Sequence, residues 1–534
     1  MTRLIASIGG EGAGEIRNRI DAALARGADA IELRADLIGG MSADDYRAVR
    51  LQLPDDVPII LTIRSAREGG QWDGGDDERV SRLIELGPFA DYIDVELELW
   101  RRSANVRQKI GLALRRADPA YGHGGEDAST LVRRRKLILS RHDASGRPPT
   151  LQKEYLSAAG QNACAVVKFA WTARSVRDNF EALELLREAP KPSVMICMGA
   201  DGDMSRIVAK KFGAFGTFAA LDATHQTAPG QLTIEELKRD YRWDAIDPST
   251  ELYGVIADPV THSLSPAVHN AAFEQAGMNR LYLKCPVRAG HESFKAFLVE
   301  VRSRPWLGFR GFSVTIPHKE NALRHLDECG GRLTDDARRV GAVNTIAIDD
   351  DATLTGHNTD LAAAVACMEA ACGGGVDALR GRHALVLGAG GVARAVVAGL
   401  IDRGASALIA NRTDARATAL AAEFGGAAVA WAQRHRSASR ADLIVNCSSV
   451  GMWPNVDQSP ISADAISHGP AVVDAVYRPR KTRLLSDAMA RRCVTVDGLA
   501  MFARQAAEQF RIWTGQQVDW DQLVQFADDR LSRV

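Results

Sequence analysis

The sequence predicts an α/β protein with an N-terminal (β/α)8 (TIM) barrel followed by a two-lobed α/β unit that contains a Rossmann dinucleotide-binding lobe. Two observations support this fold class. Eight short apolar runs alternate with helix-compatible stretches up to about residue 245, which is the rhythm of a (β/α)8 barrel. A glycine-rich turn at 388–393 joins an apolar run to a helix-compatible stretch, which is typical of a Rossmann lobe.

The bulk composition excludes several classes of protein. With 534 residues the chain is too long for a single core. Lys and Arg total 66 and Asp and Glu total 67, so the charge balance indicates no nucleic-acid or membrane-surface partner. The apolar runs have strand length, which argues against a membrane-spanning helix, and no targeting pattern precedes Leu4, which predicts a cytoplasmic location. Eight cysteines without a C-x-x-C pair favour reduced thiols, and no metal is expected.

The front half supplies one predicted strand for each position of a barrel. The strands are Leu4–Ile8, Ala30–Leu33, Ile59–Ile63, Tyr92–Leu97, Lys136–Leu139, Ala165–Phe169, Val194–Met198 and Thr217–Leu221. The clearest helix-like stretches between them are Glu15–Ala25, Asp77–Leu86, Asn105–Ala117, Val176–Glu188 and Met204–Phe212. In this fold the chemistry lies at the carboxyl ends of the strands.

Charged residues are found near those predicted strand ends. They are Glu32 and Arg34 at the end of the second strand, Arg64 and Glu68 after the third, Asp94 and Glu96 in the fourth, His142 at the end of the fifth, and Lys168 inside the sixth. A lysine in an apolar strand is costly unless the barrel interior is a site. Burial and nearby cations such as Arg64 would lower its pKa and give an amine able to attack a carbonyl, with His142 moving protons. This predicts a Schiff-base lyase or aldolase site. The alternative is a lysine that extends to solvent and a hydrogen-bonded core histidine.

Six motifs of the front half, in order, resemble type I 3-dehydroquinate dehydratase. They are ELRAD (32–36), TIRSAREGG (62–70), SRHD (140–143), VKFA (167–170), MGADGDMSR (198–206) and TAPGQ (227–231). The resemblance implies that Lys168 forms an imine with the substrate ketone, while His142, oriented by Glu68, removes the C2 proton and helps water leave. It also implies that Arg206 holds the carboxylate, that the segment 222–232 is a lid, and that the remaining substrate contacts are Glu32, Arg34, Arg64, Thr227 and Gln231. Two departures are Thr227, where serine is usual, and the run after His142, which lacks the usual aromatic residue.

A short polar connection at 239–252 separates the halves, and we place the boundary near 247. Strands and helices alternate again from 253 to about 360, which predicts a substrate lobe. Ser265 is expected to cap a helix whose first turn contains Pro266, and serine hydroxyls there suit a carboxylate, although Ser265 could serve only as a cap. The segment 314–319 is expected to be a strand that ends in Lys319. Lys319 and Asp360 could transfer a proton beside a hydride-carrying cofactor, or be two surface charges.

The glycine-rich turn predicts the cofactor site. The strand Ala384–Leu387 leads into a turn made by Gly388, Ala389, Gly390, Gly391, Val392 and Ala393. Glycines let the backbone approach a pyrophosphate, and the following helix offers free N–H groups. The next strand ends in Asn411, Arg412 and Thr413, with Arg416 one turn later, where an NAD site would carry Asp or Glu. We therefore predict NADP. The alternative is that these arginines are solvated surface charges.

The back half also resembles a known family. The runs HSLSPAVHN (262–270), SVTIPHK (313–319), GAVNT (341–345), HNTD (357–360), GAGGVAR (388–394), NRT (411–413), NCSSVGM (446–452), DAVYRPRKT (474–482) and Asp497–Gln505 resemble shikimate dehydrogenase over 253–515. The resemblance implies that Lys319 and Asp360 are the catalytic pair and that Gly498 belongs to the cofactor site. The implied substrate contacts are Ser263, Ser265, Thr315, Asn344, Tyr477 and Gln505. The serine pair favours shikimate over quinate. Leu361 stands where the family usually carries glycine.

Together the resemblances imply a fused shikimate-pathway enzyme of the plant type, with 3-dehydroquinate, 3-dehydroshikimate and shikimate as its small-molecule partners. We expect a barrel at 1–246, a substrate lobe at 247–365, an NADP lobe at 366–500 and closing helices at 501–534. The chain is expected to be a monomer or homodimer. Two alternatives are a back half that prefers quinate and a metabolite sensor that has lost catalysis. The presence of Lys168, His142, Lys319 and Asp360 together argues against a sensor.

Overall fold

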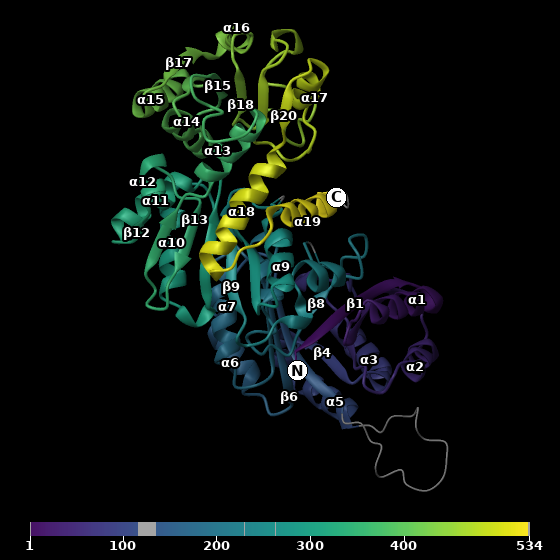
Figure 1. Ribbon diagram of the computed structural model, residues 1–534. Coiled ribbons are helices and arrows are strands. Elements are labelled where there is room, and N and C mark those ends of the chain that lie inside the picture. Colours follow the sequence, from purple (N-terminus) through teal and green to yellow (C-terminus); the bar gives the residue numbers. More distant parts are fainter. Residues whose placement is uncertain (1, 116–134, 229, 262, 532–534) are drawn as a thin grey trace. The chain divides into compact units, whose positions relative to one another are not determined.

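The computed structural model describes residues 2–115, 135–228, 230–261 and 263–531, which form two compact units that span 1–250 and 251–534 (Figure 1). Both units are α/β. Three positions named in the sequence analysis lie outside the described residues: Ala117, Pro229 of the expected lid, and His262. Across the described ranges, no helix combines the length and the apolar character needed to cross a membrane.

The first unit is the predicted barrel. Its strands are β1 (Arg3–Glu11), β2 (Ala30–Gly39), β3 (Ile59–Thr62), β4 (Tyr92–Glu96), β5 (Lys136–Asp143), β6 (Cys164–Thr172), β7 (Ser193–Met198) and β8 (Gly216–Ala219). They are parallel neighbours in the order β7-β6-β5-β4-β3-β2-β1-β8. The Phe215 amide, just before β8, donates to the Ser193 carbonyl of β7 at 2.8 Å and closes the ring. All eight predicted strands are confirmed.

Helices follow the strands of the barrel. They are α1 (Gly12–Ala25), α2 (Ala43–Gln52), α3 (Asp76–Leu86), α4 (Leu97–Arg102), α5 (Ala104–Arg115), α6 (Leu151–Ala159), α7 (Asp178–Arg187) and α8 (Asp203–Ile207). Two expectations need correction. Glu32 and Arg34 lie inside β2, because β1 and β2 stay paired as far as Glu11 and Gly39 after a register shift. The helix expected to reach Phe212 ends at Ile207.

The first sheet of the second unit has the order β10-β9-β11-β13-β14-β12. Its strands are β9 (Glu251–Ala257), β10 (Arg280–Pro286), β11 (Phe309–Val314), β12 (Arg332–Leu333), β13 (Thr345–Ile348) and β14 (Leu354–His357), and its helices are α9 (Ser265–Gln275), α10 (His291–Arg302), α11 (Lys319–Glu328) and α12 (Asp335–Val340). Lys319 does not end a strand as expected but begins α11. The strand stops at Val314 because the chain turns at 315–318, where the His318 amide donates to the Thr315 carbonyl at 2.8 Å, and Pro317 has no N–H that could continue a ladder. Ser265 is the first helical residue rather than the cap, and its amide donates to the Ser263 hydroxyl at 3.3 Å.

The second sheet is parallel, with the order β17-β16-β15-β18-β19-β20. Its strands are β15 (His383–Leu387), β16 (Ser406–Asn411), β17 (Ala427–Ala430), β18 (Leu443–Asn446), β19 (Ala471–Asp474) and β20 (Val494–Val496), and its helices include α14 (Gly391–Asp402), α15 (Asp414–Phe424), α16 (Arg434–Ala438) and α17 (Arg483–Ala490). The strand order reverses at β15, which is the topology of a Rossmann lobe, so this prediction is confirmed.

Two helices connect the sheets of the second unit. α13 (Asp360–Ala371) leads from β14 to β15, and α18 (Gly498–Thr514) returns from β20 to the first sheet, as the yellow helix in Figure 1 shows. α19 (Trp520–Leu531) then buries Leu523 and Ala527 in one apolar cluster with Val268 of α9. The cavity described below lies where α11, α13 and α18 meet.

Candidate active sites

Lys168 lies inside the barrel between two carboxylates. Its side chain is 5% exposed, and its Nζ donates to Glu32 Oε1 at 2.9 Å and to Asp94 Oδ2 at 3.2 Å. The Ser7 and Thr62 hydroxyls also donate to Glu32. Burial opposes the ionisation of Glu32, but the charges of Lys168 and Arg34 outweigh it and lower its pKa to about 2. The sequence analysis placed both cations and carboxylates around Lys168, and the direct hydrogen-bond partners of its amine are the carboxylates Glu32 and Asp94.

Asp94 connects Lys168 to Arg64. Its Oδ1 accepts from Arg64 Nη2 at 3.0 Å and from the Ser140 hydroxyl, while its Oδ2 accepts from Lys168. Burial is again opposed by Arg64 and Lys168, and the pKa of Asp94 falls below its ordinary value. Asp94 was noticed in the sequence only as a charge in strand four. Because the inner face of a strand alternates with the outer face, this position could have been assigned to the barrel interior.

His142 lies on the neighbouring strand, two residues beyond Ser140, which pairs with Lys168. Glu68 Oε2 accepts from the His142 amide at 2.8 Å and lies 3.3 Å from Nδ1. Burial is the main cause that lowers the pKa of His142 well below its usual range, and the charges of Arg64 and Lys168 add to it. Burial also raises the pKa of Glu68 to about 8. The imidazole is therefore neutral near pH 7 and can accept a proton.

The remaining predicted barrel residues differ in their partners. Arg34 makes a two-pronged ion pair with Asp36 at 2.9 and 2.7 Å. Arg206 is 4% exposed and donates to the Phe218 carbonyl at 3.3 Å, and within the described part of the chain it has no ion-pair partner. The Thr227 amide and hydroxyl both donate to Gln231 Oε1, at 3.1 and 3.0 Å. Arg206 is thus a buried cation available to an anionic ligand.

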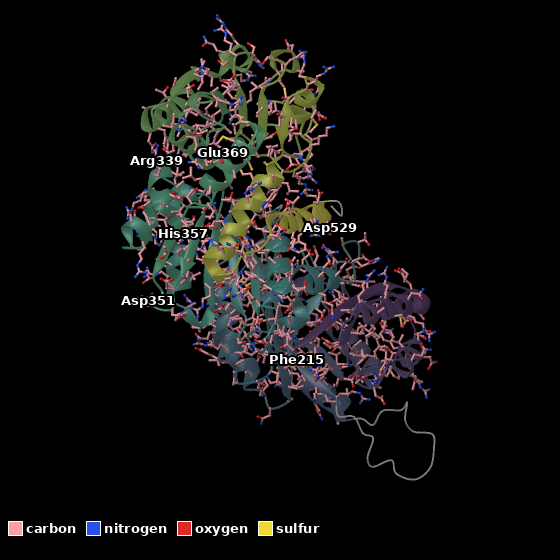
Figure 2. All side chains as sticks on the ribbon, viewed as in Figure 1. Phe215, Arg339, Asp351, His357, Glu369 and Asp529 are labelled. Atoms are coloured by element: carbon pink, nitrogen blue, oxygen red, sulfur yellow. The ribbon has the colours of Figure 1, made fainter. Side chains whose placement is uncertain are left out.

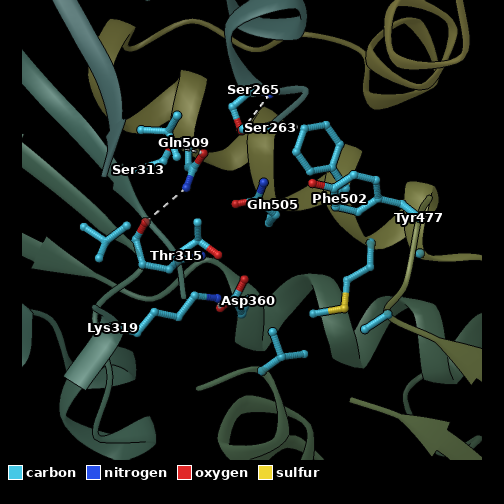
Figure 3. Close-up of a pocket in the computed structure, with 17 residues that line it drawn as sticks. Ser263, Ser265, Ser313, Thr315, Lys319, Asp360, Tyr477, Phe502, Gln505 and Gln509 are labelled. Atoms are coloured by element: carbon cyan, nitrogen blue, oxygen red, sulfur yellow. Dashed lines mark hydrogen bonds and ion pairs between the residues drawn. The ribbon is translucent and has the colours of Figure 1, made fainter. Parts of the chain in front are cut away.

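The second unit holds a cavity of about 130 Å³ between its two sheets (Figure 3). Ten of the predicted residues line it: Ser263, Ser265, Thr315, Lys319, Asn344, Asp360, Val392, Tyr477, Gly498 and Gln505. Figure 3 shows Ser263 and Ser265 at one end and Lys319 and Asp360 at the other. The hydroxyl pair and the charged pair are therefore placed to contact opposite ends of one small ligand.

Lys319 and Asp360 form a direct ion pair although 41 residues separate them in the sequence. Their side chains are 9% and 6% exposed. Behind Asp360, the Thr359 amide donates to Asn344 Oδ1 at 2.8 Å and Asn344 Nδ2 donates to the Thr359 hydroxyl at 2.9 Å. These bonds fix the start of α13, so the carboxylate is held beside the ammonium.

Sequence reasoning missed several residues of this cavity. Ser313, Met501, Phe502 and Gln509 also line it. The Ser313 hydroxyl donates to Gln509 Oε1 at 2.8 Å, and Gln509 Nε2 donates to the Thr345 hydroxyl at 3.0 Å. Gln509 lies one helical turn after Gln505, and this spacing could have identified it as part of the same face of α18.

The glycine-rich turn has the shape that a dinucleotide requires. Gly388 has φ +118°, and a Cβ there would lie 3.0 Å from the Cys447 carbonyl, so only glycine fits. A Cβ on Gly390 would meet nothing within 4 Å, which leaves space above the start of α14. A Cβ on Gly498 would lie 2.5 Å from the Val476 carbonyl. The free N–H groups at the start of α14 can therefore receive a pyrophosphate.

The residues predicted to hold the 2′-phosphate lie at the end of β16 and just after it. Arg412, Thr413 and Arg416 are exposed, and Arg416 donates to the Ala389 carbonyl of the glycine turn at 3.2 Å. Asn411 Nδ2 donates to the Thr413 carbonyl at 2.9 Å and closes the turn. Arg412 has no hydrogen-bond or ion-pair partner among the residues described. Cations and a hydroxyl beside the turn fit a phosphate on the adenosine ribose.

Four family models match successive parts of the chain. Residues 4–248 match the model described as type I 3-dehydroquinase, and 255–346 match the shikimate dehydrogenase substrate binding domain. Residues 374–462 match shikimate / quinate 5-dehydrogenase, and 498–522 match the shikimate 5′-dehydrogenase C-terminal domain.

Three similar proteins illustrate the relationship. The chloroplastic bifunctional 3-dehydroquinate dehydratase/shikimate dehydrogenase of Arabidopsis thaliana is 37% identical over 505 residues, which cover 92% of this chain and 78% of the relative. A shikimate dehydrogenase (NADP(+)) of Moorella thermoacetica is 40% identical over 51% of this chain and 90% of its own. A crystal structure of the Thermus thermophilus shikimate 5-dehydrogenase with NADP(H) and shikimate is 39% identical, covers 52% of this chain and 99% of its own, and has a TM-score of 0.46.

Proposed function

This chain belongs to the bifunctional 3-dehydroquinate dehydratase/shikimate dehydrogenases, and from this premise we propose which of its residues perform each reaction. It dehydrates 3-dehydroquinate to 3-dehydroshikimate and reduces that product to shikimate with NADPH, two steps of the shikimate pathway. We assign the first reaction to the Lys168 cluster of the barrel and the second to the cavity that contains Lys319 and Asp360.

In the barrel, the Lys168 amine attacks the substrate ketone and forms an imine with loss of water. The protonated imine withdraws electrons from the adjacent carbon, so the C2 proton becomes acidic. His142 removes that proton and returns it to the departing hydroxyl, which leaves as water, and hydrolysis then frees Lys168. The observation that carries this assignment is a buried lysine held by Glu32 and Asp94 beside a neutral imidazole on the next strand. Glu68 orients the imidazole through its contact with Nδ1 at 3.3 Å.

Arg206 binds the substrate carboxylate in this proposal. Among the residues that the structure describes, this buried guanidinium donates to a backbone carbonyl and forms no ion pair, so it gains from an incoming anion. The ring hydroxyls are assigned to Glu32, Arg34, Arg64 and Gln231. Thr227, which shares a hydrogen bond with Gln231, keeps the hydroxyl of the usual serine and serves the same lid.

In the second unit, Lys319 donates the proton to the carbonyl oxygen of the substrate, and Asp360 holds its ammonium in place. NADPH supplies the hydride when it is bound. Ser263 and Ser265 hold the carboxylate at the far end of the cavity, while Thr315, Asn344, Tyr477 and Gln505 contact the ring. The supporting observation is that one cavity contains the ion pair and the serine pair at opposite ends.

For the cofactor, Gly388, Ala389, Gly390, Gly391, Val392 and Ala393 would cradle the pyrophosphate, and Gly498 would border the reactive end. Asn411, Arg412, Thr413 and Arg416 would hold the 2′-phosphate. The absence of a carboxylate at the end of β16 supports NADP over NAD. A monomeric or homodimeric state and a cytoplasmic location stay predictions, and the Arabidopsis relative is described as chloroplastic.

Incubation of the purified protein with 3-dehydroquinate and NADPH, followed by mass spectrometry of the products, tests both assignments. The wild type should form shikimate and oxidise NADPH. Lys168→Ala should form neither product from 3-dehydroquinate yet still reduce added 3-dehydroshikimate. Lys319→Ala should stop at 3-dehydroshikimate. If Lys168→Ala still dehydrates its substrate, the barrel assignment is wrong. If the wild type reduces 3-dehydroquinate to quinate in preference to reducing 3-dehydroshikimate, the second unit is a quinate dehydrogenase instead.

A further inference from the structure

α13 and α14 are in close contact at a residue without a side chain, Gly399 of α14. α13 begins with Asp360, and α14 begins in the glycine turn. A Cβ built on Gly399 of α14 would lie 2.5 Å from Val365 Cγ2 and 3.5 Å from Leu361 Cδ1, both on α13. A separation of 2.5 Å is far inside van der Waals contact, so the helices pack at this distance only because position 399 is glycine.

The same helix also touches the other member of the ion pair. A Cβ on Gly391, the first residue of α14, would lie 2.8 Å from Lys319 Cδ and 3.3 Å from Lys319 Cβ. One side of α14 therefore rests on the stem of Lys319, and a later turn rests on the helix that carries Asp360. The separation of Lys319 and Asp360 consequently depends on how closely α13 packs on α14.

We propose that Gly399 is a positioning residue for the reductase, which sets the place of Asp360 relative to Lys319 through its contact with Val365. This inference rests on the proposed roles of Lys319 and Asp360. It also accounts for Leu361: the space over Gly399 receives Leu361 and Val365, so a larger residue at 361 does not displace the start of α13.

The geometry amplifies a change at this contact. Near its far end, α13 is tied to the end of α14 by Glu369, marked in Figure 2, which accepts from Arg403 Nε at 2.8 Å. If that tie acts as a pivot, Asp360 is nine residues from it and Val365 is four, so the start of α13 moves about twice as far as the contact point. Valine is restricted to one main rotamer in a helix and cannot turn away from an added methyl group.

The test is Gly399→Ala. Alanine has a higher helix propensity than glycine, so a weaker helix cannot explain a loss of activity in this variant. We expect the turnover rate of the reductase to fall on the order of tenfold, because small misplacements of reacting groups are costly. The pH profile of this rate should shift, while the KM for NADPH and the dehydratase rate stay unchanged. Adding Val365→Ala removes the methyl that clashes and should return the reductase rate to within about twofold of Val365→Ala alone.

Two results would overturn the inference: an unchanged reductase rate in Gly399→Ala, or a loss that Val365→Ala does not restore. Val365→Leu enlarges the same contact from α13 and should give the same phenotype, so it decides the matter if Gly399→Ala does not fold. Gly111→Ala is the matched control, since Gly111 is a glycine of α5 with open space around its Cβ position. An active Asp360→Asn would instead refute the proposed site, whereas an inactive Asp360→Asn beside a fully active Gly399→Ala refutes this inference alone.

Discussion

Replacing Lys168 with methionine should abolish dehydration and destabilise the barrel at the same time. Methionine keeps the length and apolar stem of the side chain but removes the amine, so no imine can form and the dehydratase rate should fall by about 10⁴-fold or more. The reductase in the same chain should be unaffected, because its site lies entirely within residues 251–534.

The size of the stability change follows from the contacts of Lys168. The pKa of Glu32 is about 2 against an ordinary 4.5, and Lys168, together with Arg34 and the Ser7 hydrogen bond, causes this lowering against the effect of burial; the lowering corresponds to about 3 kcal/mol. Without Lys168, Glu32 and Asp94 lose their shared cation while buried, and breaking such a pair costs about 3–5 kcal/mol. Because the pKa of Glu32 is lowered in the folded state, its contribution is present above about pH 4.5 and is lost as the pH falls toward 2. The penalty of Lys168→Met should therefore be largest at pH 7 and shrink at pH 3.

Urea denaturation of the barrel transition at pH 7 and pH 3 measures this penalty. The matched control is Lys153→Met, which removes an exposed lysine of α6 and should change stability by less than about 0.5 kcal/mol. Adding Glu32→Gln to Lys168→Met should recover part of the lost stability, since one unpaired carboxylate is removed. A Lys168→Met protein that is as stable as the wild type at pH 7, or that still dehydrates 3-dehydroquinate, would refute the reasoning.

Three further predictions concern the other groups. Asp360→Asn should lower the turnover rate of the reductase by about 10²–10⁴-fold and leave the KM for NADPH unchanged. The loss of NADPH absorbance measures both quantities. A rise in KM without a fall in turnover would contradict the proton-transfer role. Arg412→Glu should raise the KM for NADPH much more than the KM for NADH. The control Arg436→Glu changes another exposed arginine of the same lobe and should alter neither KM. An equal rise in both KM values for Arg412→Glu would speak against a 2′-phosphate contact. Burial raises the pKa of Glu68 to about 8, so the protein should lose stability as the pH rises from about 4.5 to 8. Urea denaturation of Glu68→Gln over this pH range should show a smaller loss of unfolding free energy. A loss equal to that of the wild type would count against a buried, protonated carboxyl.

The barrel could be predicted from sequence because each strand is a local apolar run. The residues that meet inside it come from distant strands, and their pairing could be predicted only in part. Lys168 and Glu32 are 136 residues apart in the chain. The apolar surroundings of Lys168 indicated a buried amine, but its contact with Asp94 depends on how the strands pair, which no single segment specifies.

In the back half, the turn at 388–393 could be predicted from sequence because the glycine spacing and the start of the helix are local features. The secondary structure around Lys319 was misjudged: the apolar run was extended past Pro317, where a proline ends a ladder. The spacing from Gln505 places Gln509 on the same face of α18, but its contacts with Ser313 and Thr345 depend on α18 returning to the first sheet. Leu361 stands where the family usually carries glycine, and the structure places its side chain over Gly399, where space is available.

The sequence by itself determined the strand and helix rhythm, the dinucleotide turn and the types of residue available for imine and proton-transfer chemistry, because these depend on short-range periodicity and backbone conformation. The tertiary structure alone decided which charges neutralise one another. Lys168 lies between Glu32 and Asp94, His142 is neutral beside Glu68, and Lys319 pairs with Asp360. The physical reason is that electrostatic energies depend on distance and burial, and both are set by which strands and helices pack together.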